Sequence, residues 1–229
     1  FAFGARSVMC LYLEPMTSQL DWNRETYAMA MAIQNLVWGV GMAVAGAAVD
    51  RHGPVWVIAG GSLIYALGIW GMTVSTTGAM LFFTGGVLTG LGVAFTGFPL
   101  AIAAMVNTVS PRRRSLIMGA GTAAGSVGQI IFSPFMQAMI DRFGWNDGLV
   151  SLSGSTLVIL PLALLLPNHA SVEEPDTEDQ TMKMALSEAI RHRGYVLLTI
   201  GVFVCGFHVT FISVHFPAYV VDLGLSGNL

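Results

Sequence analysis

Residues 110–128 read SPRRRSLIMGAGTAAGSVG, in which three consecutive arginines are followed by an uncharged stretch rich in glycine and alanine. Charge is scarce elsewhere too, because the 229 residues are 54% hydrophobic and only 10% charged, with a mean hydropathy of +0.69. A soluble domain carries about 25% charged residues, and a surface this poor in charge does not stay in solution. The composition therefore predicts an integral membrane protein and excludes a soluble globular domain.

Five long runs contain no Asp, Glu, Lys or Arg, at 26–49, 52–111, 115–140, 148–172 and 194–221. A membrane helix needs roughly 20 apolar residues, so the run from 52 to 111 has room for two helices, with a turn at 75–78. Backbone groups in lipid must be hydrogen-bonded within their own segment, which favours helices. We therefore expect an all-α integral membrane protein with seven spans, near 1–20, 27–48, 55–74, 79–106, 115–138, 148–167 and 195–217. Because Phe1 is not an initiator Met and the last residues closely follow the seventh span, we expect a piece of a longer protein.

The basic residues are distributed unequally between the two sides of these spans. One side carries seven of them, whereas the loops of the other side hold only Arg24 and Arg142. Since cytoplasmic loops are enriched in Lys and Arg, we expect a multi-pass protein of the cell membrane, plasma or inner, with loops 49–54, 107–114 and 168–194 in the cytoplasm. The arginine triplet is then a topology anchor at the inner surface.

Small residues four apart recur in the spans, as in Gly86, Gly90 and Ala94, and in Gly121 and Gly125. Membrane helices associate by close packing, which such spacing permits. The pattern is equally compatible with a static bundle and with helices that slide.

A family resemblance is carried by the segment GAAVDRHGPVWVI at 46–58. Gly46, Asp50, Arg51 and Gly53 match the Gly-x-x-x-Asp-Arg-x-Gly signature of the major facilitator superfamily, found there in the same cytoplasmic loop. The stretches GLGVAFTGFP at 90–99, MGAGTAAGSVGQIIFSP at 118–134 and FGW at 143–145 resemble the monocarboxylate porters and the oxalate–formate antiporters. The resemblance extends over essentially the whole chain.

The resemblance implies a twelve-helix fold of two six-helix halves. In this chain it gives an N-terminal six-helix bundle at 1–167, whose first helix is truncated, a cytoplasmic linker at 168–194, and the first helix of the C-terminal half at 195–229. Within the linker, TMKMALSEAIRHR at 181–193 has the pattern of a short amphipathic helix. That helix lies on the membrane surface or caps the seventh span, and the sequence favours neither. For Gly46, Asp50, Arg51 and Gly53 the resemblance implies a cytoplasmic gate that latches alternate conformations.

Ionisable residues at membrane depth are candidates for function. Arg6 lies roughly 18 Å from the span boundary near Ser18 at the helical rise, and its guanidinium has the planar fork of donors that suits a carboxylate. In some monocarboxylate transporters a Lys-Ser pair falls at a similar place to Arg6-Ser7. The structural alternative is that Arg6 reaches the interface or pairs with a helix end. His208 lies at a comparable depth in the seventh span, and imidazole changes its charge at physiological pH, so it is a candidate for substrate binding and proton coupling or a neutral interhelical partner. Gln34, Asn35 and Gln129 are further substrate-binding candidates, although hydrogen bonds between helices explain them equally well.

These features together predict a secondary active transporter of small organic anions, with proton-coupled transport of monocarboxylates by alternating access. The alternatives are an exchanger of dicarboxylates or drug-like compounds, and a non-transporting membrane sensor on the same fold. The expected partners are the anion, protons and the lipid bilayer, without nucleic acid and without a required oligomer. Nothing in the motifs points to an enzyme, a metal site or a cofactor.

The predicted sidedness can be tested by labelling single cysteines in the full-length protein. Cysteine placed at Ser110 and cysteine placed at Thr76, in a background without Cys10 and Cys205, should react with an impermeant reagent from opposite sides of the membrane. Reaction of both from the outside would contradict the seven-span topology.

Overall fold

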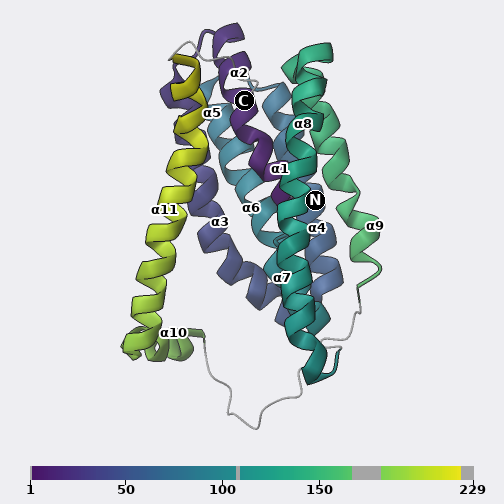
Figure 1. Cartoon of the computed structure of the whole chain (residues 1–229), viewed down its shortest axis with the longest axis vertical. Coiled ribbons are helices and arrows are strands. Elements are labelled where there is room, and N and C mark those ends of the chain that lie inside the picture. The colour runs from purple at the N-terminus through teal and green to yellow at the C-terminus, as the bar shows by residue number, and fades with distance from the viewer. Residues whose placement is uncertain (1, 107–108, 167–181, 223–229) are drawn as a thin grey trace. The chain divides into compact units, whose positions relative to one another are not determined.

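The computed structural model describes residues 2–106, 109–166 and 182–222. The chain divides into two compact units, residues 1–171 and residues 172–229, and each is described by itself (Figure 1). All regular secondary structure in the described ranges is helical. Four helical stretches there are long and apolar enough to cross a membrane, Arg24–His52, Pro54–Thr73, Gly78–Val106 and Arg112–Ala163. The predicted all-α class is confirmed.

The first predicted span is a broken helix. It consists of α1 (Ala2–Ser7), the 3₁₀ segment η1 (Val8–Tyr12) and α2 (Leu13–Gln19). A 3₁₀ stretch in the middle of a helix often marks a hinge or a strained sequence. No Pro or Gly lies within 8–12 to announce this break.

The second and third spans are α3 (Arg24–His52) and α4 (Pro54–Thr73), and Gly53 alone separates them. Gly53 has φ 81° and ψ 157°, a left-handed-side conformation that a residue with a Cβ rarely adopts. The prediction of a loop at 49–54 is therefore wrong in one detail. Asp50 and Arg51 belong to the last turn of α3 and not to a loop.

The fourth span contains four segments, α5 (Gly78–Leu81), the π-helical η2 (Phe82–Leu88), α6 (Thr89–Phe95) and α7 (Phe98–Val106). The hydroxyl of Thr77 accepts a hydrogen bond from the amide of Met80, which caps the first turn. The hydroxyl of Thr89 donates to the carbonyl of Thr84 at 2.8 Å and satisfies an acceptor within the widened turn.

The fifth and sixth predicted spans are joined in α8 (Pro111–Leu157), which is followed by α9 (Ile159–Ala163). Non-helical angles at Gly144, φ 85° and ψ 167°, divide α8 into two helices. Directly after this break, Trp145 is buried and its indole N–H donates to the side-chain oxygen of Gln19. The segment 143–145 thus turns the chain and holds it against the end of α2. At the other end of α8, Arg112, Arg113 and Arg114 are exposed in the first turn.

Close contacts at glycine bring α3, α4 and α6 side by side, as Figure 1 shows. A Cβ added at Gly86 or Gly90 would lie within 3.0 Å of α3 atoms, and one added at Gly92 would lie 2.4 Å from the Cα of Tyr65 on α4. The prediction that the small residues of the fourth span permit close packing is thus confirmed. In contrast, an added Cβ at Gly125 meets nothing within 4 Å.

The second unit contains α10 (Met182–Arg191) and α11 (Arg193–Asp222), separated only by His192. The amide of His192 donates to the carbonyls of Glu188 and Ala189. On α10, Ala189 is half-buried and Ile190 is 61% exposed. The two interpretations of this amphipathic helix stay open, and most of the predicted linker falls outside the described residues.

The packing predicts different effects for two glycine-to-alanine changes. Gly92→Ala in the full-length protein should lower its Tm by several degrees, because the new methyl group meets the backbone of Tyr65 and overpacking costs about 1–3 kcal/mol. Gly60→Ala on α4 is the matched control, because its Cβ meets no atom within 4 Å. Equal melting temperatures for the two variants, measured in detergent, would contradict the α4–α6 contact.

Candidate functional site

Arg6 is half-buried on α1, immediately before the helix changes to 3₁₀ geometry. Two side chains of α3 hold its guanidinium. One terminal nitrogen donates to the side-chain oxygen of Asn35, and the central carbon lies over the ring of Trp38, 4.5 Å from its centroid. Because Asn35 and Trp38 are three residues apart, they share one face of α3. The structure thus brings two predicted site residues together, Arg6 and Asn35.

The sequence analysis did not identify Trp38. An aromatic residue in a membrane span is usually an interface anchor or a packing element, so its type alone gave no signal. The spacing of Trp38 was a signal that could have identified it. Trp38 lies four residues after Gln34 and three after Asn35, and this spacing places it on the same helix face as these two predicted binding residues.

Three buried polar atoms of α1 and α3 lack hydrogen-bond partners. They are Nε of Arg6 itself, Nε1 of Trp38 and Nε2 of Gln34, and all three are buried. Gln34 is only 3% exposed and lies on the same side of α3 as Trp38. A buried donor without an acceptor costs about 1–3 kcal/mol. Unpaired donors on α1 and on α3 are what an anion with acceptor oxygens would satisfy.

Among the described residues, no carboxylate forms an ion pair with Arg6. The hydrogen bond to Asn35 is to a neutral amide, and the contact with Trp38 is a cation–π interaction, which stabilises the positive charge without using its N–H groups. The nitrogen atom Nε therefore remains available for another acceptor.

Three tyrosine hydroxyls hold the first span on both sides of Arg6. Tyr65 of α4 donates to the carbonyl of Ala2 at 3.3 Å, and Tyr27 of α3 donates to the carbonyl of Met9 at 2.6 Å. Tyr12 lies 3.5 Å from the sulfur of Met136 on α8. The backbone at Gly4 approaches Gly128 of α8 so closely that an added Cβ would lie 2.9 Å from its carbonyl oxygen. Contacts with three other helices thus fix the position of Arg6 along the span.

Of the other predicted binding residues, Gln129 lies in the same unit as Arg6 and His208 in the second unit. Gln129 is half-buried on α8, and the described residues show no hydrogen bond between it and Arg6. His208 belongs to the second unit, where it is exposed on α11 with its ring edge-on to Phe207 at 6.1 Å. Their roles stay predictions.

The residues predicted to form a cytoplasmic gate lie at the junction of α3 and α4. Asp50 and Arg51 are exposed in the last turn of α3, and an added Cβ at Gly46 would meet nothing within 4 Å. Only Gly53 has a conformation that requires glycine, since its φ is 81°. The gating role stays a prediction.

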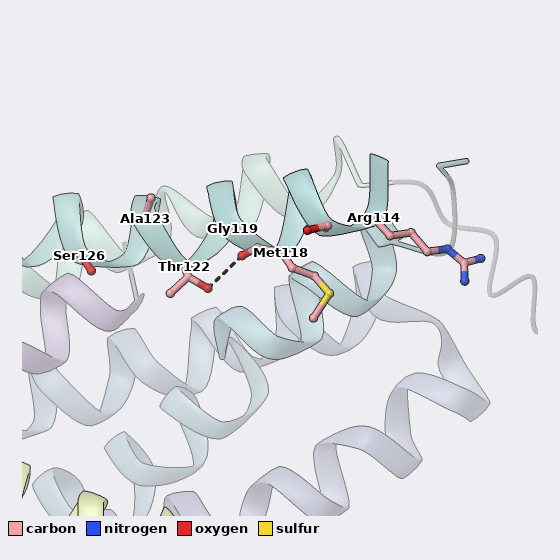
Figure 2. Close-up of a pocket in the computed structure, with 7 residues that line it drawn as sticks. Arg114, Met118, Gly119, Thr122, Ala123 and Ser126 are labelled. Atoms are coloured by element: carbon pink, nitrogen blue, oxygen red, sulfur yellow. Dashed lines mark hydrogen bonds between the residues drawn. The ribbon is translucent and has the colours of Figure 1, made fainter. Parts of the chain in front are cut away.

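An open hollow of about 900 Å³ follows one face of α8 (Figure 2). Figure 2 shows Arg114 at one end and Ser126 at the other, and the hydroxyl of Thr122 donating to the carbonyl of Met118 at 2.9 Å. By helical register, Gln129 continues the same face one turn beyond Ser126. The lining comes from α8 alone and does not include Arg6, Asn35 or Trp38. It consists of Arg114, Ser115, Met118, Gly119, Thr122, Ala123 and Ser126.

Comparison with protein families gives a match over the whole chain. The model of the Major Facilitator Superfamily matches residues 1–229. The sequence-based resemblance to this superfamily is therefore confirmed.

Curated relatives are named as transporters. The chain is 26% identical over 204 residues to monocarboxylate transporter 11 of Mus musculus. The aligned region covers 87% of the chain and 44% of that protein. The chain is 31% identical over 159 residues to monocarboxylate transporter 12 of Homo sapiens, covering 68% of the chain and 30% of that protein. It is 27% identical over 190 residues to the agnestins efflux protein AgnL12 of Paecilomyces divaricatus, covering 81% of the chain and 42% of that protein. The chain thus spans less than half the length of these relatives, and their names agree with the prediction of a transporter rather than an enzyme.

Proposed function

Because the chain belongs to the Major Facilitator Superfamily, we propose that it is part of a secondary active transporter of small organic anions. Arg6 is the binding group for the substrate carboxylate, and Asn35, Gln34 and Trp38 surround it. Monocarboxylates are the proposed substrates, as in the names of the mammalian relatives.

The single observation that carries this proposal is a half-buried arginine in a membrane span without an acidic partner. A guanidinium presents its donors in a fork whose geometry matches a carboxylate. With one terminal nitrogen engaged by Asn35 and Nε free, an anion can complete the hydrogen bonding of the head group. Such charge-assisted bonds are roughly twice as strong as neutral ones.

The proposed mechanism is alternating access, in which two halves rock around a site near the membrane midplane. The anion neutralises Arg6 on binding, and the half that contains α1 to α9 moves as a unit because glycine contacts and tyrosine hydrogen bonds join its helices. The arginine-rich side of this half, with residues 49–54 and 107–114, faces the cytoplasm of a cell membrane.

Proton coupling is assigned to His208. Histidine is the residue type suited to carrying a transported proton, whereas arginine keeps its charge. A proton that binds at His208 would accompany the anion and make the transported pair electrically neutral.

The relative named as an efflux protein for agnestins supports a second candidate, the export of larger drug-like compounds. Substrate size separates the two candidates, because the same arginine can hold a carboxylate on a small or a large molecule.

Substitution of Arg6 tests the anion site. In proteoliposomes that contain the full-length protein, Arg6→Gln should reduce uptake of small monocarboxylates at least tenfold, because a charge-assisted bond contributes about 1.5–3 kcal/mol. Arg6→Lys should retain part of the uptake, since its charge survives but the fork of donors does not.

Thermal stability is measured beside uptake, with Trp56→Leu on the exposed face of α4 as the control variant. A folded Arg6→Gln protein with full uptake of monocarboxylates would refute the anion site. A Tm unchanged or raised in Arg6→Gln, with uptake lost, is the expected result, because a charge in the membrane is costly.

Substitution of His208 tests proton coupling separately. His208→Gln should abolish the stimulation of uptake by an inward proton gradient, while exchange of labelled for unlabelled substrate continues, because only net transport needs the proton. Uptake that still responds fully to the gradient would assign the coupling to another group.

A further inference from the structure

We propose that Trp38 is the positioning residue that sets the orientation of the Arg6 guanidinium for anion binding. The inference rests on the proposed function, since it assigns a role within the same site. Trp38 acts through Arg6 and needs no contact of its own with the substrate.

The geometry supplies two restraints that differ in kind. The Cζ of Arg6 lies over the ring of Trp38, 4.5 Å from the ring centroid. The oxygen of Asn35 takes a hydrogen bond from the edge. The hydrogen bond alone leaves the guanidinium free to rotate about that bond, and the contact with the ring alone leaves the guanidinium free to turn above the ring. Together they restrain both motions, and Nε is buried without a hydrogen-bond partner.

Tryptophan suits this task because its ring attracts a cation without accepting its N–H groups. A neighbouring aspartate or glutamate would stabilise the charge more strongly, but it would occupy the donors that a carboxylate substrate needs. Indole provides the strongest cation–π face among the aromatic side chains. The described part of the chain gives Arg6 the aromatic face and no ion pair.

The indole N–H of Trp38 lacks the hydrogen bond that the indole N–H of the buried Trp145 makes. Trp145 donates its indole N–H to Gln19, and this bond accounts for its polar atom. The N–H of Trp38 is buried and has no partner. The polar function of Trp38 in the structure is therefore its contact with Arg6 through the ring face.

A series at position 38 in the full-length protein tests this role. Trp38→Leu removes the π face, and Trp38→Phe keeps a weaker one. We expect the half-saturating concentration for monocarboxylate uptake to rise at least tenfold in Trp38→Leu and about threefold in Trp38→Phe, since a desolvated cation–π contact contributes on the order of a tenfold to thirtyfold change in affinity. The maximal rate should change by less than about twofold, because a positioning contact acts on binding.

Fluorinated tryptophans incorporated at position 38 separate the π face from the shape of the side chain. Each added fluorine withdraws charge from the ring face while its size changes little, so the half-saturating concentration should rise stepwise with fluorine number. Trp70→Leu is the matched control, because Trp70 is 50% exposed on α4. This control should leave the half-saturating concentration unchanged.

The outcomes distinguish this inference from the proposed function. Equal half-saturating concentrations for tryptophan and its fluorinated forms would overturn the role of Trp38, even where Trp38→Leu itself fails to fold. If Arg6→Gln loses uptake while fluorination has no effect, the anion site stands and only the positioning role falls. If Arg6→Gln transports fully, the proposed function falls, and any effect of fluorination then reports a contact with the substrate itself.

Discussion

The structure of the first unit is organised around one constraint, a half-buried guanidinium on the broken first helix without an acidic partner among the described residues. An arginine at the centre of a membrane helix costs about 3 kcal/mol on insertion scales. A desolvated cation–π contact contributes about 2 kcal/mol, and a hydrogen bond to a charged group contributes about 1.5–3 kcal/mol. Trp38 and Asn35 therefore provide stabilisation of the same order as the cost of Arg6, while its buried Nε remains without a hydrogen-bond partner.

This compensation works only if α1 and α3 keep their register. The tyrosine bonds provide it, because Tyr65 and Tyr27 bind backbone carbonyls four residues before and three residues after Arg6. The second of these carbonyls, that of Met9, lies in the 3₁₀ segment. A 3₁₀ turn rises about 2.0 Å per residue and an α-helix 1.5 Å, so the length of η1 determines how far Arg6 lies from the end of the span. The broken first helix is thus part of what positions the charge.

The sequence was sufficient for the parts of the structure that depend on composition along the chain. Gaps between charges located the helices, and Arg6 and Asn35 were identified as polar residues within apolar spans. Contacts across the bundle were not predictable in the same way. The partners Arg6 and Trp38 are 32 residues apart in sequence, and only the spacing of Trp38 from Gln34 and Asn35 distinguishes it from the other tryptophans of the spans. The break at 8–12 was missed because it contains neither Gly nor Pro. The junction at 49–54 was expected as a loop because its charges were read as a boundary, whereas a single glycine with positive φ is enough to separate two helices.

Contacts that compensate Arg6 in the absence of an anion have a consequence for the proposed transport cycle. In a symporter the empty site must change its access from one side of the membrane to the other, so the binding charge has to cross that step without a substrate to neutralise it. In an exchanger the binding site changes its access only with a substrate bound, so its charge does not have to cross this step without a substrate. In this chain, Arg6 is compensated by an aromatic face and an amide of α3, both within the same unit. That compensation moves with the arginine when the unit moves, whereas an ion pair with the opposite half would have to break. The arrangement therefore meets a physical requirement of symport, since the empty site keeps its compensating contacts throughout the return step.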